Sequence, residues 1–144
     1  MSRKISELAA LIEGASLIGD KNTVIRDLVH DSRQAGRGAM FVCMAGAHVD
    51  GHRFIPDVVK QGAAALLTER EIEAPAGVAV LRVPDLNAAL QKIAPYFFNY
   101  PAQQMRLIGI TGTNGKTTTS YLVRALLRRA GYKVGLIGTI QIMI

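Results

Sequence analysis

Residues 105–119 read MRLIGITGTNGKTTT, and this stretch decides the fold expected for the C-terminal part of the 144-residue chain. The apolar run Met105–Thr111 predicts a buried strand, and the glycine-bearing turn Gly112–Gly115 follows it. Helical spacing then predicts a helix over Lys116–Ala130, and the apolar run Lys133–Ile140 predicts a second strand. A strand, a helix and a strand in this order form a single β-α-β crossover with parallel strands.

A turn between a buried strand and a helix suits a polyphosphate, because several backbone N–H groups and the positive end of the helix point at one place. Gly112 and Gly115 let a phosphate approach the backbone. The Lys116 ammonium can reach the β and γ phosphates of ATP, and the Thr117 hydroxyl can bind Mg²⁺. The predicted ATP-binding residues are Gly112, Thr113, Asn114, Gly115, Lys116, Thr117 and Thr118. The sequence therefore predicts that ATP, or another nucleoside triphosphate, binds here together with Mg²⁺; the alternative is an ordinary strand-to-helix turn.

The first 104 residues predict a small α/β domain of their own. The predicted strands are Val24–Val29, Ala39–Met44, Ala63–Thr68 and Val78–Val83, and the predicted helices are Arg3–Glu13, Asp50–Gln61 and a stretch capped by Asp85. Pro95 is expected to kink the third helix or end it early, and the polar stretch Ala102–Gln104 is interpreted as a linker. We therefore expect an α/β protein with one domain over residues 1–104 and the truncated start of a second over residues 105–144.

The net charge of +6 is unevenly distributed along the chain. Asp85 is the last acidic residue, so residues 86–144 carry basic charge alone. Surfaces of complete domains normally mix both signs, and the apolar strands expected in residues 105–144 need neighbours to bury them. We therefore expect this second part to be cut short. Its arginines, Arg124, Arg128 and Arg129, are interpreted as a solvated helix face without interleaved aromatic residues, and no nucleic-acid partner is expected.

Composition also bears on location. No apolar run reaches the roughly 18 to 20 residues that a membrane span requires. Met1–Lys4 leads into an amphipathic segment and not into the apolar core of a signal peptide. We therefore expect a cytoplasmic, monomeric protein with no membrane partner. Cys43, the single cysteine, lies in the apolar run Met40–Met44 and is expected to be a small buried hydrophobe, not a catalytic thiol.

The phosphate loop carries a resemblance to a known family. The general pattern has a glycine where this chain has Ile110. The run from Gly109 to Thr119 resembles the ATP loop of the Mur ligases and their relatives, in which that glycine is likewise not required. Folylpolyglutamate synthases share Gly112–Lys116 but usually continue with Gly-Ser, where this chain has Thr117-Thr118. Cyanophycin synthetases can show the same loop, so the first domain has to distinguish these families.

The first domain resembles the UDP-binding domain of the Mur ligases that add the third residue, or the terminal dipeptide, to the muramoyl peptide. The matching positions are Asp31-Ser32-Arg33, Met40-Phe41-Val42, Gly46 and Asp50-Gly51-His52-Arg53-Phe54-Ile55. The dipeptide-adding enzymes usually have serine after the glycine at position 112, so Thr113-Asn114 favours the enzymes that add the third residue. Ala39, where the family commonly has an acidic residue, and Pro95 depart from the pattern. The likeness spans nearly the whole chain.

The resemblance implies a UDP-sugar site in the first domain. The residues expected to contribute are Ser32 and the backbone near His30, at the UDP moiety, and Ala47, His48 and Val49, which line the uridine pocket. Ser32 could instead be a turn-forming residue that bonds to its own backbone. A metal site at His48 and His52 is rejected, because Gly51 argues against a helix that would put both rings on one face and no third ligand is evident.

The resemblance also implies an activity, that of an ATP-dependent ligase of peptidoglycan synthesis. Such an enzyme adds a diamino acid, meso-2,6-diaminopimelate or L-lysine, to UDP-N-acetylmuramoyl-L-alanyl-D-glutamate through an acyl phosphate. Lys116 is the expected catalytic residue, because it neutralises charge on the transferred phosphoryl group, and Thr117 is the expected Mg²⁺ ligand. The diamino acid is expected to bind beyond Ile144, so we expect the isolated chain to bind a uridine nucleotide weakly and not to ligate.

Three alternatives stay open on the sequence alone. They are a non-catalytic module that binds UDP-sugars, the dipeptide-adding Mur ligase, and a P-loop protein that binds nucleic acid. The intact mass, or the reading frame past Ile144, distinguishes a module from a ligase: a stop codon there favours the module, and several hundred further residues favour the ligase. Salt-sensitive binding to DNA would identify the third class.

Overall fold

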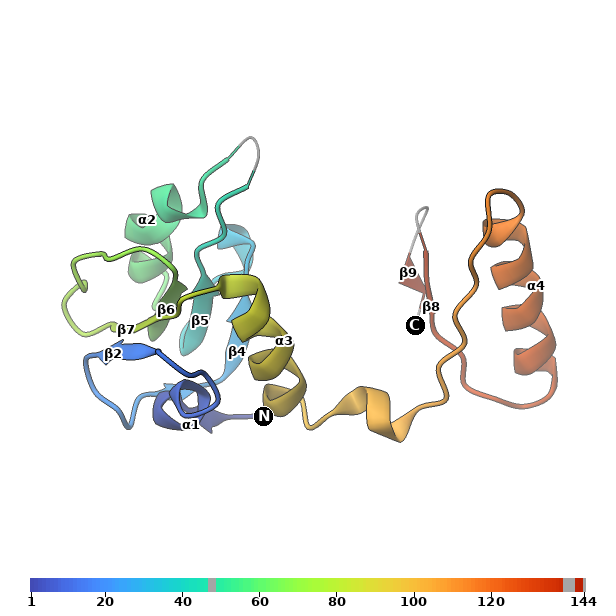
Figure 1. The fold of residues 1–144 in the computed structure, drawn as a ribbon, viewed down its shortest axis with the longest axis horizontal. Helices are drawn as coiled ribbons and strands as arrows, with labels where there is room; N and C mark the ends of the chain where they lie inside the picture. Colours follow the sequence, from blue (N-terminus) through green and yellow to red (C-terminus); the bar gives the residue numbers. More distant parts are fainter. Residues whose placement is uncertain (47–48, 139–141, 144) are drawn as a thin grey trace. The chain divides into compact units, whose positions relative to one another are not determined.

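The computed structural model describes residues 1–46, 49–138 and 142–143, and the chain divides into two compact units, Met1–Gln104 and Met105–Ile144 (Figure 1). The α/β class expected from the sequence is confirmed, since helices and strands alternate along the chain. Within the described residues, no helix combines the length and the apolar character that crossing a membrane requires.

The first unit is built on a five-stranded sheet in the order β2-β7-β6-β5-β4. The parallel strands are β4 (Asp27–Val29), β5 (Ala39–Val42), β6 (Ala65–Thr68) and β7 (Ala79–Arg82), and β2 (Ser16–Ile18) joins β7 antiparallel at one edge. Every residue of β5 and β6 is buried. Such fully buried strands are covered on both faces, which explains why their sequences are continuous apolar runs without alternation.

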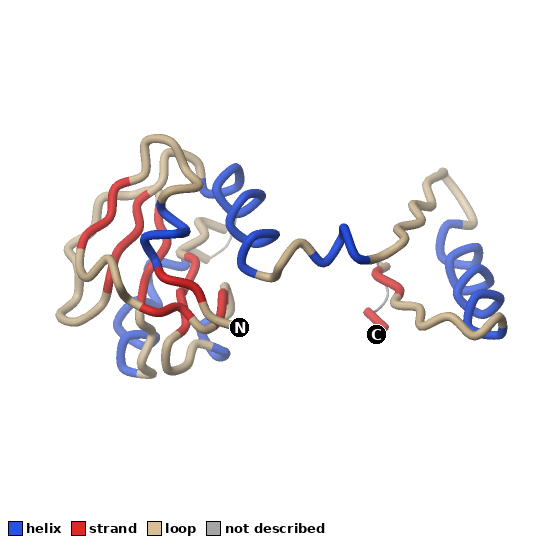
Figure 2. The backbone as a smooth tube through the Cα atoms, turned by 90° about the horizontal axis from the view of Figure 1, so that it is seen from below, coloured by secondary structure: helices blue, strands red, loops and turns tan. Residues whose placement is uncertain are grey.

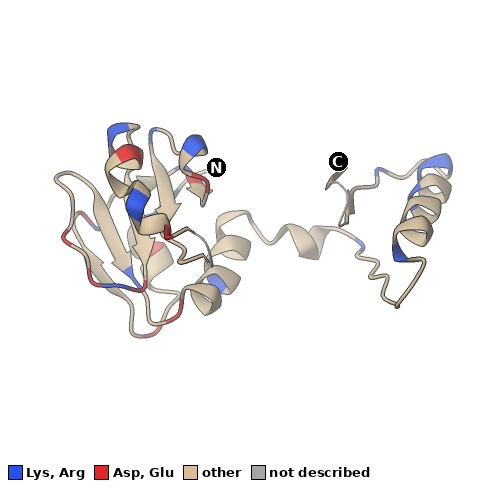
Figure 3. Cartoon of the chain, turned by 90° about the horizontal axis from the view of Figure 1, so that it is seen from above, with Lys and Arg blue, Asp and Glu red and all other residues tan. Residues whose placement is uncertain are grey.

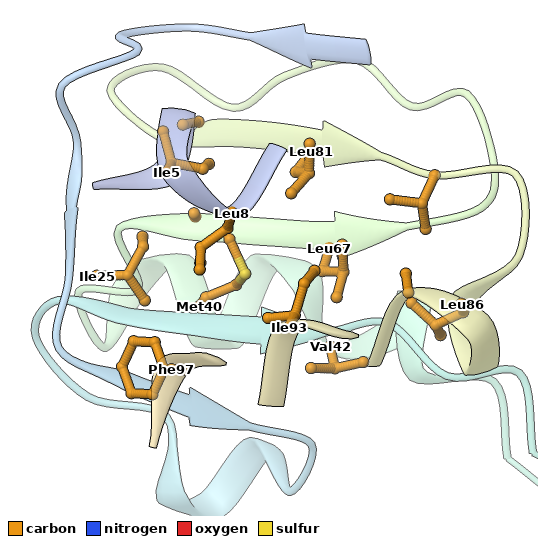
Figure 4. Packing of buried hydrophobic residues seen from close by; sticks show 14 residues of the cluster. Ile5, Leu8, Ile25, Met40, Val42, Leu67, Leu81, Leu86, Ile93 and Phe97 are labelled. Atoms are coloured by element: carbon orange, nitrogen blue, oxygen red, sulfur yellow. The ribbon is translucent and has the colours of Figure 1, made fainter. Parts of the chain in front are cut away.

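Helices cover both faces of this sheet, and Figure 2 shows the strands lying between them. Met40 and Val42 of β5 pack on one face, against residues of α1 (Ile5–Ala9) and α3 (Leu86–Phe97). Figure 4 shows this cluster, with Phe97 and Ile93 of α3 directed at the sheet. The alternate residue Phe41 points to the opposite face, where it packs with Val58 of α2 (Ile55–Lys60). Side chains therefore alternate between the two faces of the sheet along β5, and the core consists of two layers, one on each face.

The expected strands of the first unit are confirmed in three cases, because β5, β6 and β7 lie inside the predicted ranges. The predicted strand Val24–Val29 is divided at Arg26 into β3 (Val24–Ile25) and β4, and Arg26 N donates to Gly38 O, which directly precedes β5, at 2.8 Å. Strand β3 pairs antiparallel with β1 (Arg3–Lys4), apart from the main sheet. Strand β2 was not predicted, because three residues carry too little periodicity to indicate a strand.

The prediction of a long first helix over Arg3–Glu13 is wrong. Only α1 is helical, since Arg3 and Lys4 pair with β3 and the chain after Ala9 tightens into successive turns. Ile5 and Leu8 of α1 are fully buried, so packing fixes this single turn and a half although such a short helix is marginal by itself. Gly14 adopts φ +74°, which agrees with its predicted function as a left-handed stop.

The expectation that the third helix ends early at Pro95 is wrong, because α3 continues through this residue to Phe97. Proline has no backbone N–H, so Pro95 removes one hydrogen bond from the helix. Because Pro95 lies in the last turn of α3, little of the helix depends on that hydrogen bond. The burial of Ile93 and Phe97 on the sheet holds the last turn in place. Beyond it, Tyr100 N donates to Pro95 O at 2.7 Å, and the short turn η3 (Pro101–Gln104) occupies the predicted linker.

The second unit confirms its helix but not its first strand. Helix α4 (Lys116–Arg129) lies where it was predicted, whereas Met105–Thr111 forms no strand. Strand β8 (Leu136–Ile137) pairs antiparallel with β9 (Ile142–Met143), and the rest of the predicted strand reaches residues 139–140, which lie outside the described residues. A buried parallel strand requires neighbouring strands, and no described residue pairs with 105–111. Leu107 is accordingly 72% exposed.

Replacing Phe97 with alanine should lower the stability of the first unit by about 3 to 5 kcal/mol, because the ring is 1% exposed and its removal leaves a cavity between α3 and the sheet. Phe98 offers the matched control, since it is adjacent but 45% exposed. Urea unfolding followed by circular dichroism measures both changes. Equal destabilisation by Phe97→Ala and Phe98→Ala would contradict the described packing.

Candidate functional site

The carboxyl ends of the parallel strands of the first unit meet at one edge of the sheet. In the parallel registers, Val29 at the end of β4 lies beside Phe41 of β5, and Val42 at the end of β5 lies beside Leu67 of β6. Polar residues lie in the segments that follow β4, β5 and β6, whereas the buried strands themselves are mainly apolar. Open α/β sheets bind ligands outside the carboxyl ends of their strands. This edge is therefore the candidate binding site of the first unit.

The segment after β4 forms a capped turn. Asp31 caps the short helix η1 (Ser32–Gln34), because its Oδ1 accepts hydrogen bonds from the backbone N and the Nε of Arg33, both at 3.0 Å. Arg33 Nη2 donates to Asp31 Oδ2 at 2.7 Å. These hydrogen bonds lower the pKa of Asp31 to about 2, so this carboxylate is ionised at neutral pH. The turn is fixed by Asp31, and His30, which precedes it, is exposed.

Ser32 is partly buried at the start of this turn. Among residues 1–46, 49–138 and 142–143, no hydrogen bond involves its hydroxyl. The side chain of Asp31 caps this turn, so the alternative in which Ser32 forms the turn through its own side chain does not hold here. The Ser32 hydroxyl can donate one hydrogen bond to a ligand and accept another.

In the loop after β5, at the same edge, backbone hydrogen bonds hold the described residues on either side of positions 47 and 48. Cys43 N donates to Leu67 O at 2.8 Å, Gly46 N donates to Val49 O at 3.0 Å, and Gly51 N donates to Met44 O at 2.8 Å. Both glycines are required by close packing, because an added Cβ would lie 2.9 Å from Val49 O at Gly46 and 2.8 Å from Met44 O at Gly51. Val49 is 48% exposed. The other two predicted uridine-pocket residues, Ala47 and His48, lie outside the described residues.

A network of four residues lies at the base of this loop, and most of it was not predicted from the sequence. His52 Nδ1 lies 2.6 Å from Asp50 Oδ1, and His52 Nε2 lies 2.8 Å from Thr68 Oγ1. Arg70 Nη1 donates to Asp50 Oδ2 at 2.5 Å. His52 thus contacts Asp50 and Thr68. One feature of the sequence could have indicated this network: Thr68 is the single polar residue of β6 and ends its apolar run.

The single cysteine is buried, as expected. Cys43 is 1% exposed, and burial raises the pKa of its thiol to about 12. A thiolate is therefore absent at neutral pH, and the side chain packs with the core on the α2 face of the sheet. The prediction that Cys43 is a small buried hydrophobe is confirmed.

The second unit places the phosphate loop at the start of α4. Gly115 precedes the helix with φ +75° and ψ −2°, a left-handed conformation that glycine adopts without strain, and Gly112 has φ +150°. No side chain caps this helix end. The first amides of an uncapped helix lack intrahelical acceptors and carry the positive end of the helix dipole. The geometry is therefore suited to an anion such as a phosphate group.

Lys116 and its neighbours supply the polar side chains of this loop. Lys116 Nζ donates to Gly112 O at 2.6 Å and lies 3.4 Å from Thr113 O, so its ammonium lies across the loop. Thr117 and Thr118 are exposed in the first turn of α4. Figure 3 shows Lys and Arg on the second unit, and residues 86–144 contain no acidic side chain. An anionic ligand would therefore meet positive charge without a competing carboxylate from this unit.

Models of two protein families match the chain. The Mur ligase family, catalytic domain, matches residues 24–98, and the Mur ligase middle domain matches residues 110–144. The first match spans both candidate segments at the edge of the sheet, and the second contains the whole phosphate loop.

Curated relatives match over nearly the whole chain. The UDP-N-acetylmuramoyl-L-alanyl-D-glutamate–2,6-diaminopimelate ligase of Caldanaerobacter subterraneus is 42% identical over 95% of the chain. The enzymes of the same name from Bacillus cereus and Geobacter sulfurreducens are 40% and 39% identical. The chain spans 27% to 29% of the length of these three relatives.

Solved structures agree with this assignment. A crystal structure of MurF from Acinetobacter baumannii is 31% identical and aligns with 86% of the chain at a TM-score of 0.67, where the chain covers 27% of that protein. A UDP-N-acetylmuramoyl-L-alanyl-D-glutamate–2,6-diaminopimelate ligase aligns with 99% of the chain at a TM-score of 0.70, and the chain covers 29% of it. At 22% identity the latter shows the fold alone. From the family match over residues 24–98 and these relatives, we conclude that the chain belongs to the Mur ligase family.

Proposed function

We propose that this chain supplies the uridine-nucleotide site and the ATP phosphate loop of a ligase that adds a diamino acid to UDP-N-acetylmuramoyl-L-alanyl-D-glutamate. One observation carries the proposal: the chain with the uncapped phosphate loop is 39% to 42% identical, over nearly its whole length, to ligases named for that substrate and 2,6-diaminopimelate. Diaminopimelate is therefore the proposed diamino acid, and L-lysine is the alternative. The complete reaction requires the remaining length that the relatives possess.

The uridine nucleotide is assigned to the carboxyl edge of the sheet in the first unit. The Ser32 hydroxyl and the backbone near His30 follow β4, and the loop that contains Ala47, His48 and Val49 follows β5. The parallel pairing of β4 with β5 supports this assignment, because it brings both segments to the same edge. The hydroxyl and free backbone groups can bind a diphosphate or read the polar edge of uracil.

ATP is assigned to the loop at the start of α4. The residues proposed to bind its phosphates are Gly112, Thr113, Asn114, Gly115, Lys116, Thr117 and Thr118. Lys116 Nζ now lies against the carbonyls of the loop, and a rotation of its flexible side chain takes it to the β and γ phosphates. Lys116 then neutralises charge on the transferred phosphoryl group. The Thr117 hydroxyl is a proposed ligand of Mg²⁺, which supplies further charge neutralisation at the phosphates.

The proposed chemistry forms an amide in two steps. The side-chain carboxylate of D-glutamate accepts the γ-phosphoryl group of ATP to give an acyl phosphate and ADP. The amine of the diamino acid then attacks the acyl carbon and displaces phosphate. Because both nucleotide substrates are intracellular metabolites, we also propose a cytoplasmic location.

The dipeptide-adding Mur ligase is the second candidate. The observation that favours it is the 36% identity to MurF from Acinetobacter baumannii over 74% of the chain, at a TM-score of 0.61.

Phosphate release by the full-length protein separates the candidates. ATP with UDP-N-acetylmuramoyl-L-alanyl-D-glutamate and diaminopimelate should release phosphate, and substitution of L-lysine should not. Release that requires the tripeptide nucleotide and D-alanyl-D-alanine would overturn the primary assignment.

Replacing Ser32 with alanine should weaken the binding of UDP by about two- to tenfold, since one hydrogen bond contributes roughly 0.5 to 1.5 kcal/mol. The matched control is Ser16→Ala, because Ser16 is exposed on the edge strand β2. Isothermal titration calorimetry with UDP measures both affinities. An unchanged affinity in Ser32→Ala would argue against a contact between this hydroxyl and the nucleotide.

Replacing Lys116 with alanine should weaken the binding of Mg-ATP by roughly ten- to a hundredfold, because hydrogen bonds to charged groups contribute about 1.5 to 3 kcal/mol. Lys133→Ala removes the same charge from an exposed position of the same unit and controls for general electrostatic attraction. A fluorescent ATP analogue, titrated in the presence of Mg²⁺, reports both dissociation constants. If both variants lose affinity equally, the loop assignment of Lys116 is wrong.

A further inference from the structure

Asp50, His52, Thr68 and Arg70 form a closed ring of hydrogen bonds beside the short helix η2 (Gly51–Phe54). From this geometry, and resting on the proposed uridine site, we propose that His52 and Arg70 are positioning residues for the uridine nucleotide. They act through Asp50, which directly follows Val49 in the loop. Neither residue is assigned a contact with the nucleotide.

The first arm of the ring passes through His52. Asp50 Oδ1 accepts a hydrogen bond from the His52 backbone N at 3.0 Å, and His52 Nδ1 lies 2.6 Å from the same oxygen. Since the carboxylate can only accept, Nδ1 carries the proton. The opposite ring nitrogen, Nε2, shares a hydrogen bond of 2.8 Å with Thr68 Oγ1. The imidazole therefore connects the loop after β5 to the end of β6.

The second arm passes through Arg70. Thr68 Oγ1 accepts a hydrogen bond from Arg70 N at 3.0 Å, and Arg70 Nη1 donates to Asp50 Oδ2 at 2.5 Å. Both carboxylate oxygens of Asp50 are thus occupied by groups anchored at the end of β6. These hydrogen bonds hold the pKa of Asp50 well below its usual range, with the side-chain hydrogen bond from His52 as the largest cause.

The ring is buried at Thr68 and partly exposed at Asp50. Thr68 is fully buried, the His52 side chain is 14% exposed, and the Asp50 side chain is 34% exposed. Ala45 and Asp50 form an isolated antiparallel bridge, so fixing Asp50 also fixes the closing pair of the loop. A loop held in its binding conformation loses less entropy when a ligand binds, which raises affinity without any further contact. The ring therefore supplies preorganisation of the segment that carries Val49.

The test compares four variants by the affinity of UDP in calorimetry. Arg70→Gln and His52→Ala open the ring and should each weaken binding by about tenfold. Arg82→Gln is the matched control for charge, since Arg82 pairs with Glu71 at 3.2 Å and lies outside the ring. His52→Asn retains a donor near the Nδ1 position and should recover part of the lost affinity.

Amide hydrogen exchange separates positioning from general destabilisation. The amides of Gly46 and Gly51, which donate within the loop, should exchange faster in Arg70→Gln and His52→Ala. The amides of the buried strands β6 and β7 should exchange as in the unsubstituted chain. Faster exchange throughout the unit would instead indicate a structural function alone and would overturn the proposal.

The affinities distinguish the remaining outcomes. If the unsubstituted chain does not bind UDP, the uridine site and the positioning proposal both fail. If it binds UDP and the ring variants bind equally well, the uridine site stands and the positioning proposal fails. Equal weakening by Arg70→Gln and Arg82→Gln would attribute the effect to net charge and would likewise overturn positioning.

Discussion

The parallel pairing of β4, β5, β6 and β7 is the constraint on which the candidate site depends. Parallel strands keep their carboxyl ends at one edge, so the segments that follow them emerge together although they are distant in sequence. The strands β5 and β6 are buried throughout, and this burial leaves their interior positions to apolar side chains. Polar groups therefore gather where the strands end. Thr68, at the last position of β6, is the fully buried polar residue at which this transition occurs.

The two segments at this edge are stabilised in different ways. The turn after β4 is local, because Asp31 caps it and pairs with Arg33 two residues later. The loop after β5 is stabilised at longer range, since Asp50 is tied to the end of β6 through the ring of side chains. Backbone packing adds a further restriction at Gly46 and Gly51, where a side chain would collide with carbonyl oxygens. The candidate binding edge therefore combines a buried sheet with a capped turn and with loop residues that hydrogen bonds hold in place.

The phosphate loop follows a different principle, because its geometry is local to one turn and one helix. The left-handed Gly115 directs the chain into α4, and the first amides of the helix are left without side-chain partners. The conformation of the segment before this loop, in contrast, depends on neighbouring strands. Ile108 is 61% exposed and Met105–Thr111 forms no strand, because an interior strand is stable only between neighbours. The chain spans 27% to 29% of the curated relatives it matches, and the middle-domain family match begins at residue 110.

The sequence by itself determined the features that depend on local chemistry. Apolar runs identified β5, β6 and β7, the glycines and Lys116 identified the phosphate loop at the start of α4, and the run around Cys43 indicated its burial. Tertiary structure decided the features that depend on distant partners. The strand β2 exists because β7 offers an edge, α3 passes through Pro95 because the sheet holds its last turn, and His52 meets Thr68 because two parallel strands end side by side. Local periodicity contains no information about such pairings, since the free energy that fixes them comes from contacts between segments far apart in the chain.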